Sequence, residues 1–213
     1  MHCSHKGGVG FVAASFGLAS HSGYPELGSS AITPLVKFMT DLENYPWPSD
    51  PVFGNSTMNI GLITGGVAAN VVPDYAKANV LVRAAVTASI LQNVVIQLAA
   101  PYNLTLTFST LKNPFTCNTV PGFQTEIFSY GTGTHDFRPN LSQRFPITSH
   151  LSFFFEKTSF LDLPSFQGSH KSYLFGPGSI LVAHTDAEYI NKSELTAAIG
   201  DYKTLITAIL AQG

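Results

Sequence analysis

In the stretch Lys77-Ala-Asn-Val-Leu-Val-Arg-Ala-Ala-Val86, small and branched apolar residues recur at every second position. The recurring residues are Ala78, Val80, Val82 and Ala84. In an extended chain this period of two places all four side chains on the same face. The stretch therefore predicts a strand that buries one face.

A helix and a further strand are predicted after this stretch. Leu91, Val94, Val95 and Leu98 have the i, i+3, i+4, i+7 spacing of an amphipathic helix. Residues 104–108 read Leu-Thr-Leu-Thr-Phe, and such alternation is typical of a half-buried strand.

Three more elements are predicted before Lys77. Residues 10–19 favour a strand with small residues on one face, and Met58–Gly66 favours a strand that ends in a glycine turn. Between them we expect a helix capped by Ser29 or Ser30, which ends at the proline-rich segment 45–51. The resulting order, β-α-β-β-α-β, predicts an α+β fold of the ferredoxin-like kind, with two helices on one face of a four-stranded antiparallel sheet. The open edges of such a sheet favour dimerisation.

The region after residue 115 contains the clearest helical periodicity of the chain. A helix is expected from a cap at Ser193, with a continuous apolar stripe that needs a surface to pack against. The residues of this stripe are Leu195, Ala198, Ile199, Tyr202, Leu205, Ile206, Ile209 and Leu210. Few further strands are predicted that would supply the surface.

Composition limits the class of protein. Charged residues make up 11% of the 213 residues, against roughly 25% in ordinary soluble domains, and the net charge is −2. The chain has no basic block, which argues against nucleic acid or an anionic membrane as a partner. No apolar run approaches the roughly 18 residues of a transmembrane helix.

Cysteines and glycosylation sequons bear on the compartment. The chain has two cysteines, Cys3 and Cys117, which leave a single disulfide between them open. Four Asn-X-Ser/Thr sequons favour a secretory or vacuolar parent protein, with a cytoplasmic one as the alternative. These sequons begin at Asn55, Asn103, Asn140 and Asn191.

Two of the seven histidines, His21 and His184, lie in tight turns rich in glycine or proline. Such turns hold a side chain in place, as a metal ligand or an oxyanion donor requires. His184-Thr-Asp186 is an H-x-D pattern, but a zinc site needs three protein ligands, and the chain offers no compact cluster around it. For any one histidine, the alternative is an exposed loop residue.

Four segments occur in an order and spacing that is specific for one family. They read Gly17-Leu-Ala-Ser-His-Ser-Gly-Tyr-Pro-Glu-Leu-Gly28, Asn59-Ile-Gly-Leu-Ile-Thr-Gly-Gly-Val-Ala-Ala-Asn-Val-Val-Pro73, Tyr173-Leu-Phe-Gly-Pro-Gly-Ser-Ile180 and Ala183-His-Thr-Asp-Ala-Glu188. With these segments the chain resembles the zinc metallopeptidase family 20, which includes acetylornithine deacetylase, succinyl-diaminopimelate desuccinylase, aminoacylases and glutamate carboxypeptidase. The resemblance spans 7–132 and 162–213 and is closest to the fungal carboxypeptidase or deacetylase-like branch.

The resemblance implies a role for each matching site residue. In this family a two-zinc α/β catalytic domain is interrupted by a lid domain, which forms a homodimer. His21 matches the lid histidine that reaches the partner's active site and stabilises the oxyanion; the alternative is a hydrogen-bonded turn histidine. Asn70 and Arg83 match residues that hold the substrate carboxylate. The remaining matches are the carboxylate-binding loop Gly176, Pro177 and Gly178, and the zinc ligand His184.

The resemblance also implies how the chain is divided. We expect a lid domain at 7–114 and the C-terminal part of an α/β zinc-hydrolase catalytic domain at 115–213, with a segment at 133–161 that has no family counterpart. The family's first H-x-D and its Glu-Glu pair precede the lid, so the chain is expected to lack the N-terminal half of the catalytic domain. Two functions follow: part of a zinc-dependent hydrolase of C–N amide bonds acting on peptides or N-acyl amino acids, or an inactive dimerisation module.

Overall fold

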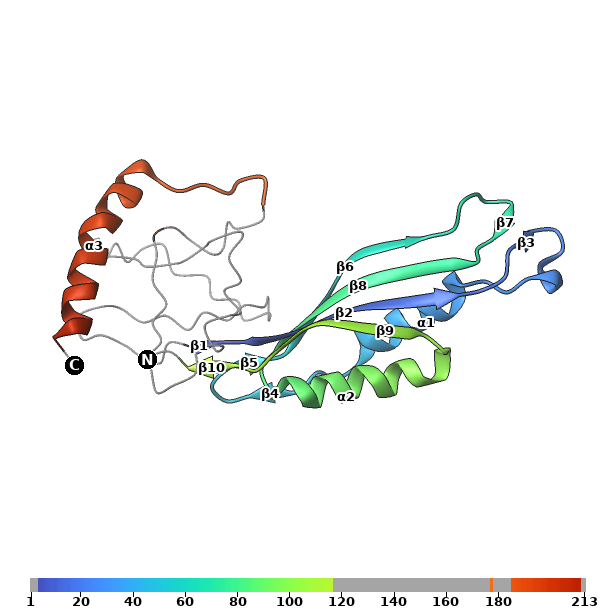
Figure 1. Cartoon of the computed structure of the whole chain (residues 1–213), viewed down its shortest axis with the longest axis horizontal. Helices are drawn as coiled ribbons and strands as arrows, with labels where there is room; N and C mark the ends of the chain where they lie inside the picture. The colour runs from blue at the N-terminus through green and yellow to red at the C-terminus, as the bar shows by residue number, and fades with distance from the viewer. Residues whose placement is uncertain (1–3, 117–176, 178–184, 212–213) are drawn as a thin grey trace, which may run out of the picture. The chain divides into compact units, whose positions relative to one another are not determined.

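The computed structural model describes residues 4–116, 177 and 185–211 of the chain. The chain divides into two compact units, of which the first contains Ser4–Phe115 and the second contains the C-terminal helix. Figure 1 labels the elements of both units.

The first unit, called the lid below, is built on a four-stranded antiparallel sheet in the order β6-β8-β2-β9. The strands are β2 (Gly7–Phe16), β6 (Thr57–Gly65), β8 (Tyr75–Ala84) and β9 (Thr105–Lys112). Residues of β8 alternate between the core and the opposite face, as the period of two predicts. The central pair β2 and β8 runs in continuous register from Gly7 opposite Ala84 to Phe16 opposite Tyr75.

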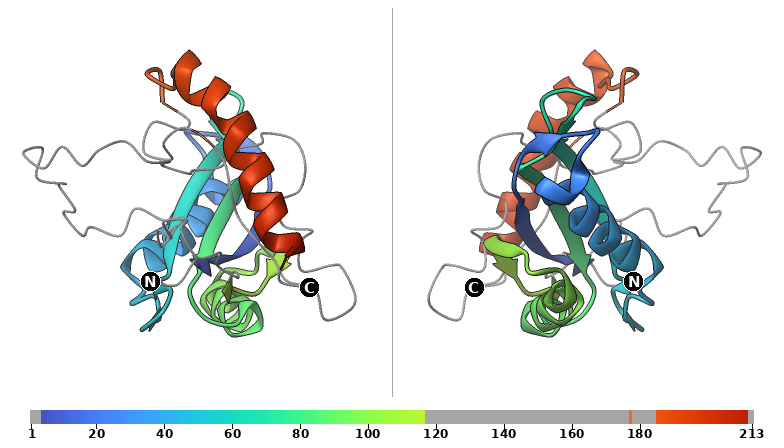
Figure 2. Two further views of the ribbon diagram at one scale, coloured as in Figure 1. Left: turned by 90° about the vertical axis from the view of Figure 1, so that its left-hand side faces the viewer. Right: turned by 90° about the vertical axis from the view of Figure 1, so that its right-hand side faces the viewer.

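Two helices, α1 (Ile32–Asn44) and α2 (Ala88–Ala99), cover one face of this sheet (Figure 2). The main elements thus follow the predicted order β-α-β-β-α-β, and the α+β fold class is confirmed. The hydroxyl of Ser30 accepts a hydrogen bond of 3.3 Å from the N–H of Thr33, but the N-cap residue of α1 is Ala31, so the predicted cap at Ser29 or Ser30 is one or two residues too early. The helix itself begins at Ile32, one residue after Ala31 in the N-cap position.

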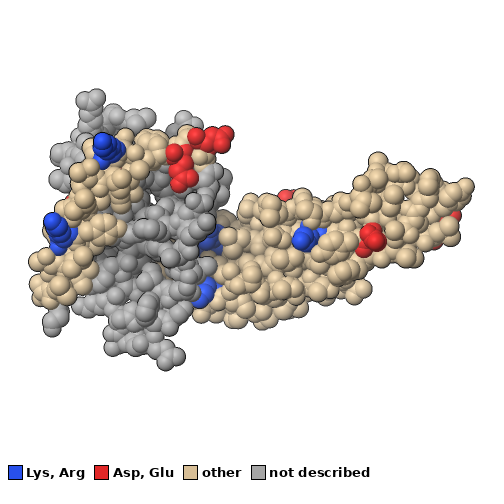
Figure 3. Space-filling view, turned by 45° about the horizontal axis from the view of Figure 1, so that its top comes forward, with Lys and Arg blue, Asp and Glu red and all other residues tan. Residues whose placement is uncertain are grey.

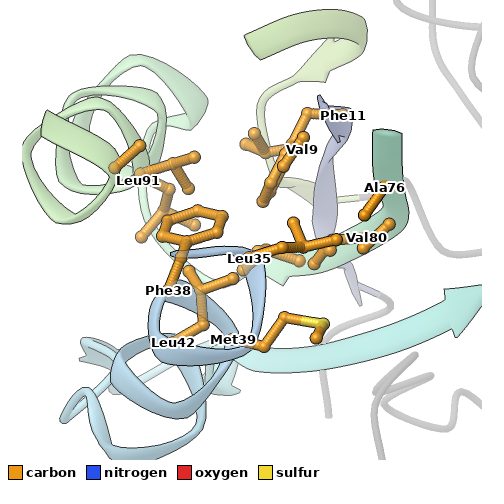
Figure 4. Packing of buried hydrophobic residues seen from close by; sticks show 14 of the residues in the cluster. Val9, Phe11, Leu35, Phe38, Met39, Leu42, Ala76, Val80 and Leu91 are labelled. Carbon is orange, nitrogen blue, oxygen red and sulfur yellow. The ribbon is translucent and has the colours of Figure 1, made fainter. Parts of the chain in front are cut away.

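The hydrophobic core lies between the helices and the sheet (Figure 4). Phe38 of α1 is at its centre, with ring centroids 6.4 Å from Phe11 of β2 and 6.4 Å from Tyr102. Aromatic pairs at such distances stabilise a core beyond the area they bury. The other fully buried large residues of the core are Val9, Leu35, Leu42, Val82, Leu91 and Val95.

Short strand pairs and single helical turns complete the lid. The pairs are β1 (Ser4–His5) with β10 (Phe115–Thr116), β3 (Ser20–His21) with β7 (Val71–Val72), and β4 (Ser49–Asp50) with β5 (Gly54–Asn55). The turns are η1 (Pro25–Leu27) and η2 (Ala100–Tyr102). The β4–β5 hairpin begins inside the segment predicted as a loop, because Asp50 accepts hydrogen bonds from the N–H groups of Val52 and Phe53 at 2.7 and 3.1 Å.

The second unit contains the helix α3 (Lys192–Leu210). Its N-cap residue is Asn191, so the predicted cap at Ser193 is two residues too late. Ala198 and Leu205 of the apolar stripe are buried, whereas Leu195, Ile199 and Ile206 are more than half exposed. Neither α3 nor any other described helix combines the length and apolar character needed to cross a membrane.

Buried His5 makes the stability of the lid depend on pH. The imidazole stacks on Phe115 with ring centroids 5.4 Å apart. Burial lowers the pKa of His5 below its ordinary value; a backbone hydrogen bond with Lys6 opposes this shift, and the charge of Arg83 acts in the same direction as burial. Below about pH 6.5 the unfolded chain therefore binds more protons at this site than the folded chain does.

The lid is accordingly expected to lose stability as the pH falls from 7 to 5, by up to about 1.4 kcal/mol per pH unit from this residue. Urea unfolding at several pH values, compared between the natural chain and His5→Gln, measures this contribution. The slope of unfolding free energy against pH should be shallower in the variant, and equal slopes would show that His5 contributes nothing.

Candidate functional site

The candidate site begins at the β3–β7 ribbon, which carries His21 and Asn70. His21 lies opposite Val71 in the antiparallel pairing. Beside this pair, the N–H of Ser22 donates a hydrogen bond of 2.9 Å to the carbonyl of Asn70. The ribbon therefore brings together two site residues that lie 49 positions apart in the sequence. Both side chains are exposed.

The turn after His21 fixes its imidazole ring. The N–H of Gly23 donates a hydrogen bond of 3.0 Å to Nδ1 of His21. A Cβ at position 23 would lie 3.2 Å from that nitrogen, so glycine allows the close approach. The N–H of Tyr24 donates to the carbonyl of His21 at 2.9 Å, which leads the chain into η1.

This hydrogen bond also sets the tautomer of His21. Because Nδ1 accepts, the proton of the neutral ring resides on Nε2. Nε2–H is then a hydrogen-bond donor on an exposed turn, where the ring of Tyr24 lies tilted to that of His21 with centroids 6.1 Å apart. This geometry suits the stabilisation of a negatively charged oxygen.

Several residues of the segments next to the ribbon are apolar and exposed. Leu18, Tyr24, Leu27 and Val67 are each at least 60% exposed. Figure 3 shows that charged side chains stand singly on the face of the lid that it presents. An apolar surrounding strengthens the hydrogen bond of a donor such as Nε2–H once water is displaced from it.

Arg83 lies at the other end of the sheet. It occupies β8 opposite Gly8 of β2 and Thr57 of β6, whereas Tyr75 begins β8 on the side of the ribbon. Arg83 is eight positions from Tyr75 along the extended chain, which corresponds to roughly 26 Å. One lid therefore does not bring Arg83 together with His21 and Asn70.

The other predicted site residues are mostly outside the described ranges. Pro177 is half-buried, while Gly176, Gly178 and His184 lie outside the described residues. The same holds for Cys3, Cys117 and the segment 133–161. Within 4–116 and 185–211, no group of three His, Cys, Asp or Glu side chains is placed to hold a metal ion. The described part of the chain thus does not form a zinc centre by itself.

Lys6 is a buried residue that the sequence analysis does not single out. Its side chain is 2% exposed, and Nζ donates a hydrogen bond to the carbonyl of Asn55. Burial lowers the pKa of this amine. Lys6 precedes β2 directly, and Gly8 pairs with Arg83, so both cationic residues lie at the same end of the lid. No sequence pattern reveals this burial, because the carbonyl acceptor of Asn55 is supplied by the distant β4–β5 hairpin.

Comparison with known proteins agrees with the resemblance. Residues 3–103 match the family model of the peptidase dimerisation domain, M20_dimer. A peptidase M20 domain-containing protein of Sordaria macrospora is 37% identical over 215 residues, which cover 97% of this chain and 41% of that protein. A probable carboxypeptidase of Aspergillus oryzae is 38% identical over 224 residues, which cover 97% of this chain and 47% of that protein. The chain spans about half the length of the curated relatives it matches.

Solved structures also match the chain. An aminopeptidase of Bacillus cereus aligns with a TM-score of 0.43 and 21% identity, over 54% of this chain and 32% of that chain. An aminobenzoyl-glutamate utilization protein of Klebsiella pneumoniae aligns with a TM-score of 0.43 and 24% identity, over 58% and 36% of the two chains. By its dimerisation domain and its fungal relatives, the chain belongs to the M20 peptidase family.

Proposed function

We propose that this chain is the lid and the C-terminal catalytic part of a zinc-dependent hydrolase that cleaves C–N amide bonds. Its substrates are peptides, as for a carboxypeptidase, or N-acyl amino acids, as for a deacylase. In this proposal the lid comprises 7–114, the catalytic part comprises 115–213, and 133–161 is an insertion. The support comes from the family, and from fungal relatives named probable carboxypeptidases that align with 97% of the chain.

The observation that carries the proposal is the hydrogen bond from Gly23 to His21, because it makes Nε2–H a donor on an exposed turn. When an amide carbonyl is attacked, its oxygen gains negative charge, and a donor that is already in place stabilises it. We propose that His21 donates this hydrogen bond in the active site of a partner subunit.

The positions of the carboxylate-binding candidates support a site shared by two subunits. Because Arg83 lies roughly 26 Å along β8 from Tyr75, which is at the ribbon end of the strand, a small substrate does not reach both Arg83 and the ribbon in one lid. We propose that His21 and Asn70 come from one protomer and Arg83 from the other. The planar guanidinium of Arg83 suits a substrate carboxylate, which it binds through two parallel hydrogen bonds.

We propose zinc as the metal of the complete enzyme, with His184 as one ligand. Among the described residues no three such side chains lie together, so in this proposal the other ligands come from residues outside the described ranges or from the rest of the parent protein. In such a centre, zinc supplies an activated water and polarises the amide carbonyl.

We propose that the homodimer forms through the β6 edge of the lid. β6 is an end strand of the four-stranded sheet, with Leu62 and Ile63 more than half exposed. A depression of about 200 Å³ lies between β6 and α1, lined by Ile32, Leu35 and Ile63 among others. Pairing of two β6 strands would satisfy the open backbone groups of the edge and cover these side chains.

Ile63→Lys is expected to convert the dimer to a monomer, because it places a charge in the apolar depression at the edge. Sedimentation velocity over a concentration series should show the dissociation constant rise by about 100-fold. Leu111→Lys is the matched control, since Leu111 is 44% exposed on the opposite edge strand β9. A dimer that dissociates equally in both variants, or in neither, would contradict the β6 interface.

A chimera tests the proposed activity. This chain replaces the corresponding part of the Aspergillus oryzae relative, which it covers to 47%. Hydrolysis of N-acyl amino acids and dipeptides is measured together with zinc content. Turnover by the chimera would support a catalytic lid, whereas a folded, zinc-loaded chimera without turnover would refute it.

The alternative is an inactive dimerisation module, which is supported by the sequence because it offers no compact ligand cluster around His184-Thr-Asp186. The chain is incubated with zinc and N-acyl amino acids. Turnover that is lost in His184→Ala would exclude the inactive module.

For the compartment we propose a secretory or vacuolar route, supported by the four sequons. In the described part of the chain, Asn55, Asn103 and Asn191 are all exposed.

A further inference from the structure

We propose that Asn103 carries an N-linked oligosaccharide that shields the free edge of β9 from other chains. The site goes beyond the hydrolase function and depends on the proposed secretory route only for the supply of the sugar donor. The proposal rests on the different settings of the described sequons and on the chemistry of the β9 edge.

At two of the described sequons, residues of the sequon make hydrogen bonds to other parts of the chain. At Asn191, the side-chain amide donates a hydrogen bond of 3.0 Å to the carboxylate of Glu194 at the start of α3. At Asn55, the backbone carbonyl accepts the hydrogen bond of buried Lys6. The next residue, Ser56, is buried, and its hydroxyl accepts a hydrogen bond of 3.0 Å from the N–H of Ala85. A bulky group at either asparagine would lie next to these hydrogen bonds.

The sequon Asn103-Leu-Thr105 lies in a different setting. Asn103 is an exposed residue between η2 and β9, with φ 51° and ψ 46° in the left-handed region that asparagine tolerates well. Thr105, the hydroxyl residue of the sequon, is also exposed, and it begins β9 opposite Ala14. The turn therefore presents both sequon side chains to solvent at the end of an edge strand.

The β9 strand is an edge that needs protection. In the described part of the chain, its eight residues pair with β2 on one side only. Its sequence, Thr-Leu-Thr-Phe-Ser-Thr-Leu-Lys, contains no proline and one charge, at Lys112. Open strands of this length and polarity are templates for pairing with other chains.

Two protective features lie at the far half of β9. The register against β2 shifts between Thr110 and Phe108, which leaves Ser109 as an extra residue in a bulge. Lys112 ends the strand with a charge. The half from Thr105 to Phe108 has neither feature, and Asn103 lies directly before it. An oligosaccharide at Asn103 would cover the unprotected half.

The glycan would also leave the proposed dimer interface free. In the strand order β6-β8-β2-β9, the two edges are at opposite sides of the sheet. A glycan at the β9 edge would thus hinder strand pairing through β9 and permit the proposed pairing through β6.

The modification is a group transfer from a lipid diphosphate-linked oligosaccharide. Nδ2 of Asn103 forms a bond with the anomeric carbon of the first sugar. The bond between that carbon and the diphosphate oxygen breaks, the lipid diphosphate leaves with the electron pair, and the amide loses one proton.

The site is tested in the full chain, directed into the secretory pathway of yeast by a cleavable leader. Mass spectrometry records the Asn-to-Asp conversion that a peptide N-glycosidase leaves at each occupied site. Asn103 is expected to be occupied in the natural chain and in Thr105→Ser, and unoccupied in Thr105→Ala. Asn103→Asp, which has no asparagine to modify, is the control in which glycosidase treatment changes nothing at this position. Aspartate keeps the size of the side chain and tolerates the same backbone conformation. An unmodified Asn103 in a secreted chain would overturn the proposal.

The shielding role is tested by light scattering. Without the glycan, Thr105→Ala, which adds no charge to the edge, is expected to raise the aggregated fraction by about threefold. A further substitution, Thr107→Lys, places a charge on the same edge and should reverse the increase. Unchanged scattering after loss of the glycan, with unchanged thermal stability, would overturn shielding.

A second comparison distinguishes failure of the glycosylation site from failure of the proposed secretory route. Glycosylation of the leader-directed chain supports the site itself. If the parent protein from its own cells then carried no N-glycan, the secretory route would be refuted and the competence of Asn103 would stand.

Discussion

Phe38→Ala is expected to lower the free energy of unfolding of the lid by about 3–5 kcal/mol. The side chain is 0% exposed. It extends from α1 toward Phe11 of β2 and Tyr102 of η2. Truncation to alanine loses the free energy gained by burying the phenyl ring. It also leaves a cavity, which the sheet on one side and the two helices on the other cannot close. Since domains are stable by about 5–15 kcal/mol, this single change consumes much of the margin.

Urea unfolding of the full chain, followed by circular dichroism, measures this loss. The matched control is Val36→Ala on the same helix, because Val36 is 45% exposed and lies outside the buried cluster. We expect its effect to stay within about 0.5 kcal/mol. Equal losses in the two variants would show that the core is not centred on Phe38.

The sequence predicts the central layers of the lid because their patterns are long and regular. The alternation in β8 and the helical spacing in α2 each depend on contacts with the core that repeat along one element. The order of elements then leaves few ways to arrange four strands and two helices, and the observed sheet order is one of them.

The short strands are not predictable in the same way. A two-residue strand such as β3 has no period, and its partner β7 lies about 50 residues away along the chain. The β4–β5 hairpin depends on the carboxylate of Asp50, which accepts two backbone N–H groups within a segment that prolines mark as irregular. Local propensity carries no information about such pairings.

For the candidate site, the sequence identifies residues but not their grouping. The glycine- and proline-rich turn singles out His21. Only the folded turn shows that Nδ1 accepts a hydrogen bond from the N–H of Gly23. The separation of Arg83 from the ribbon follows from the register of β8. Lys6 is missed because a lysine before a strand has the pattern of an exposed residue, whereas here the β4–β5 hairpin supplies a carbonyl acceptor for it.

His21→Ala is expected to lower kcat of the chimera by about 10²–10³-fold with little change in KM, as the loss of one oxyanion donor does. The substitution removes Nε2–H, the donor that the hydrogen bond from Gly23 prepares. His21→Gln keeps an N–H group at a similar reach and should retain part of the rate. Unchanged urea stability in both variants would separate a catalytic effect from a structural one. A drop in kcat that is equal for Gln and Ala, together with a loss of stability, would assign His21 to the structure of the turn.

Mixing two inactive variants tests whether the site is shared between subunits. A His21→Ala chain still supplies Arg83, and an Arg83→Ala chain still supplies His21. In a mixed dimer these intact residues meet at one of the two sites. Random pairing gives half mixed dimers, so activity should recover to about a quarter of that of the unsubstituted chimera. If both residues acted within one chain, each chain of every dimer would carry a defect, and mixing would restore nothing. Because Arg83 and the ribbon lie at opposite ends of β8, we expect the recovery.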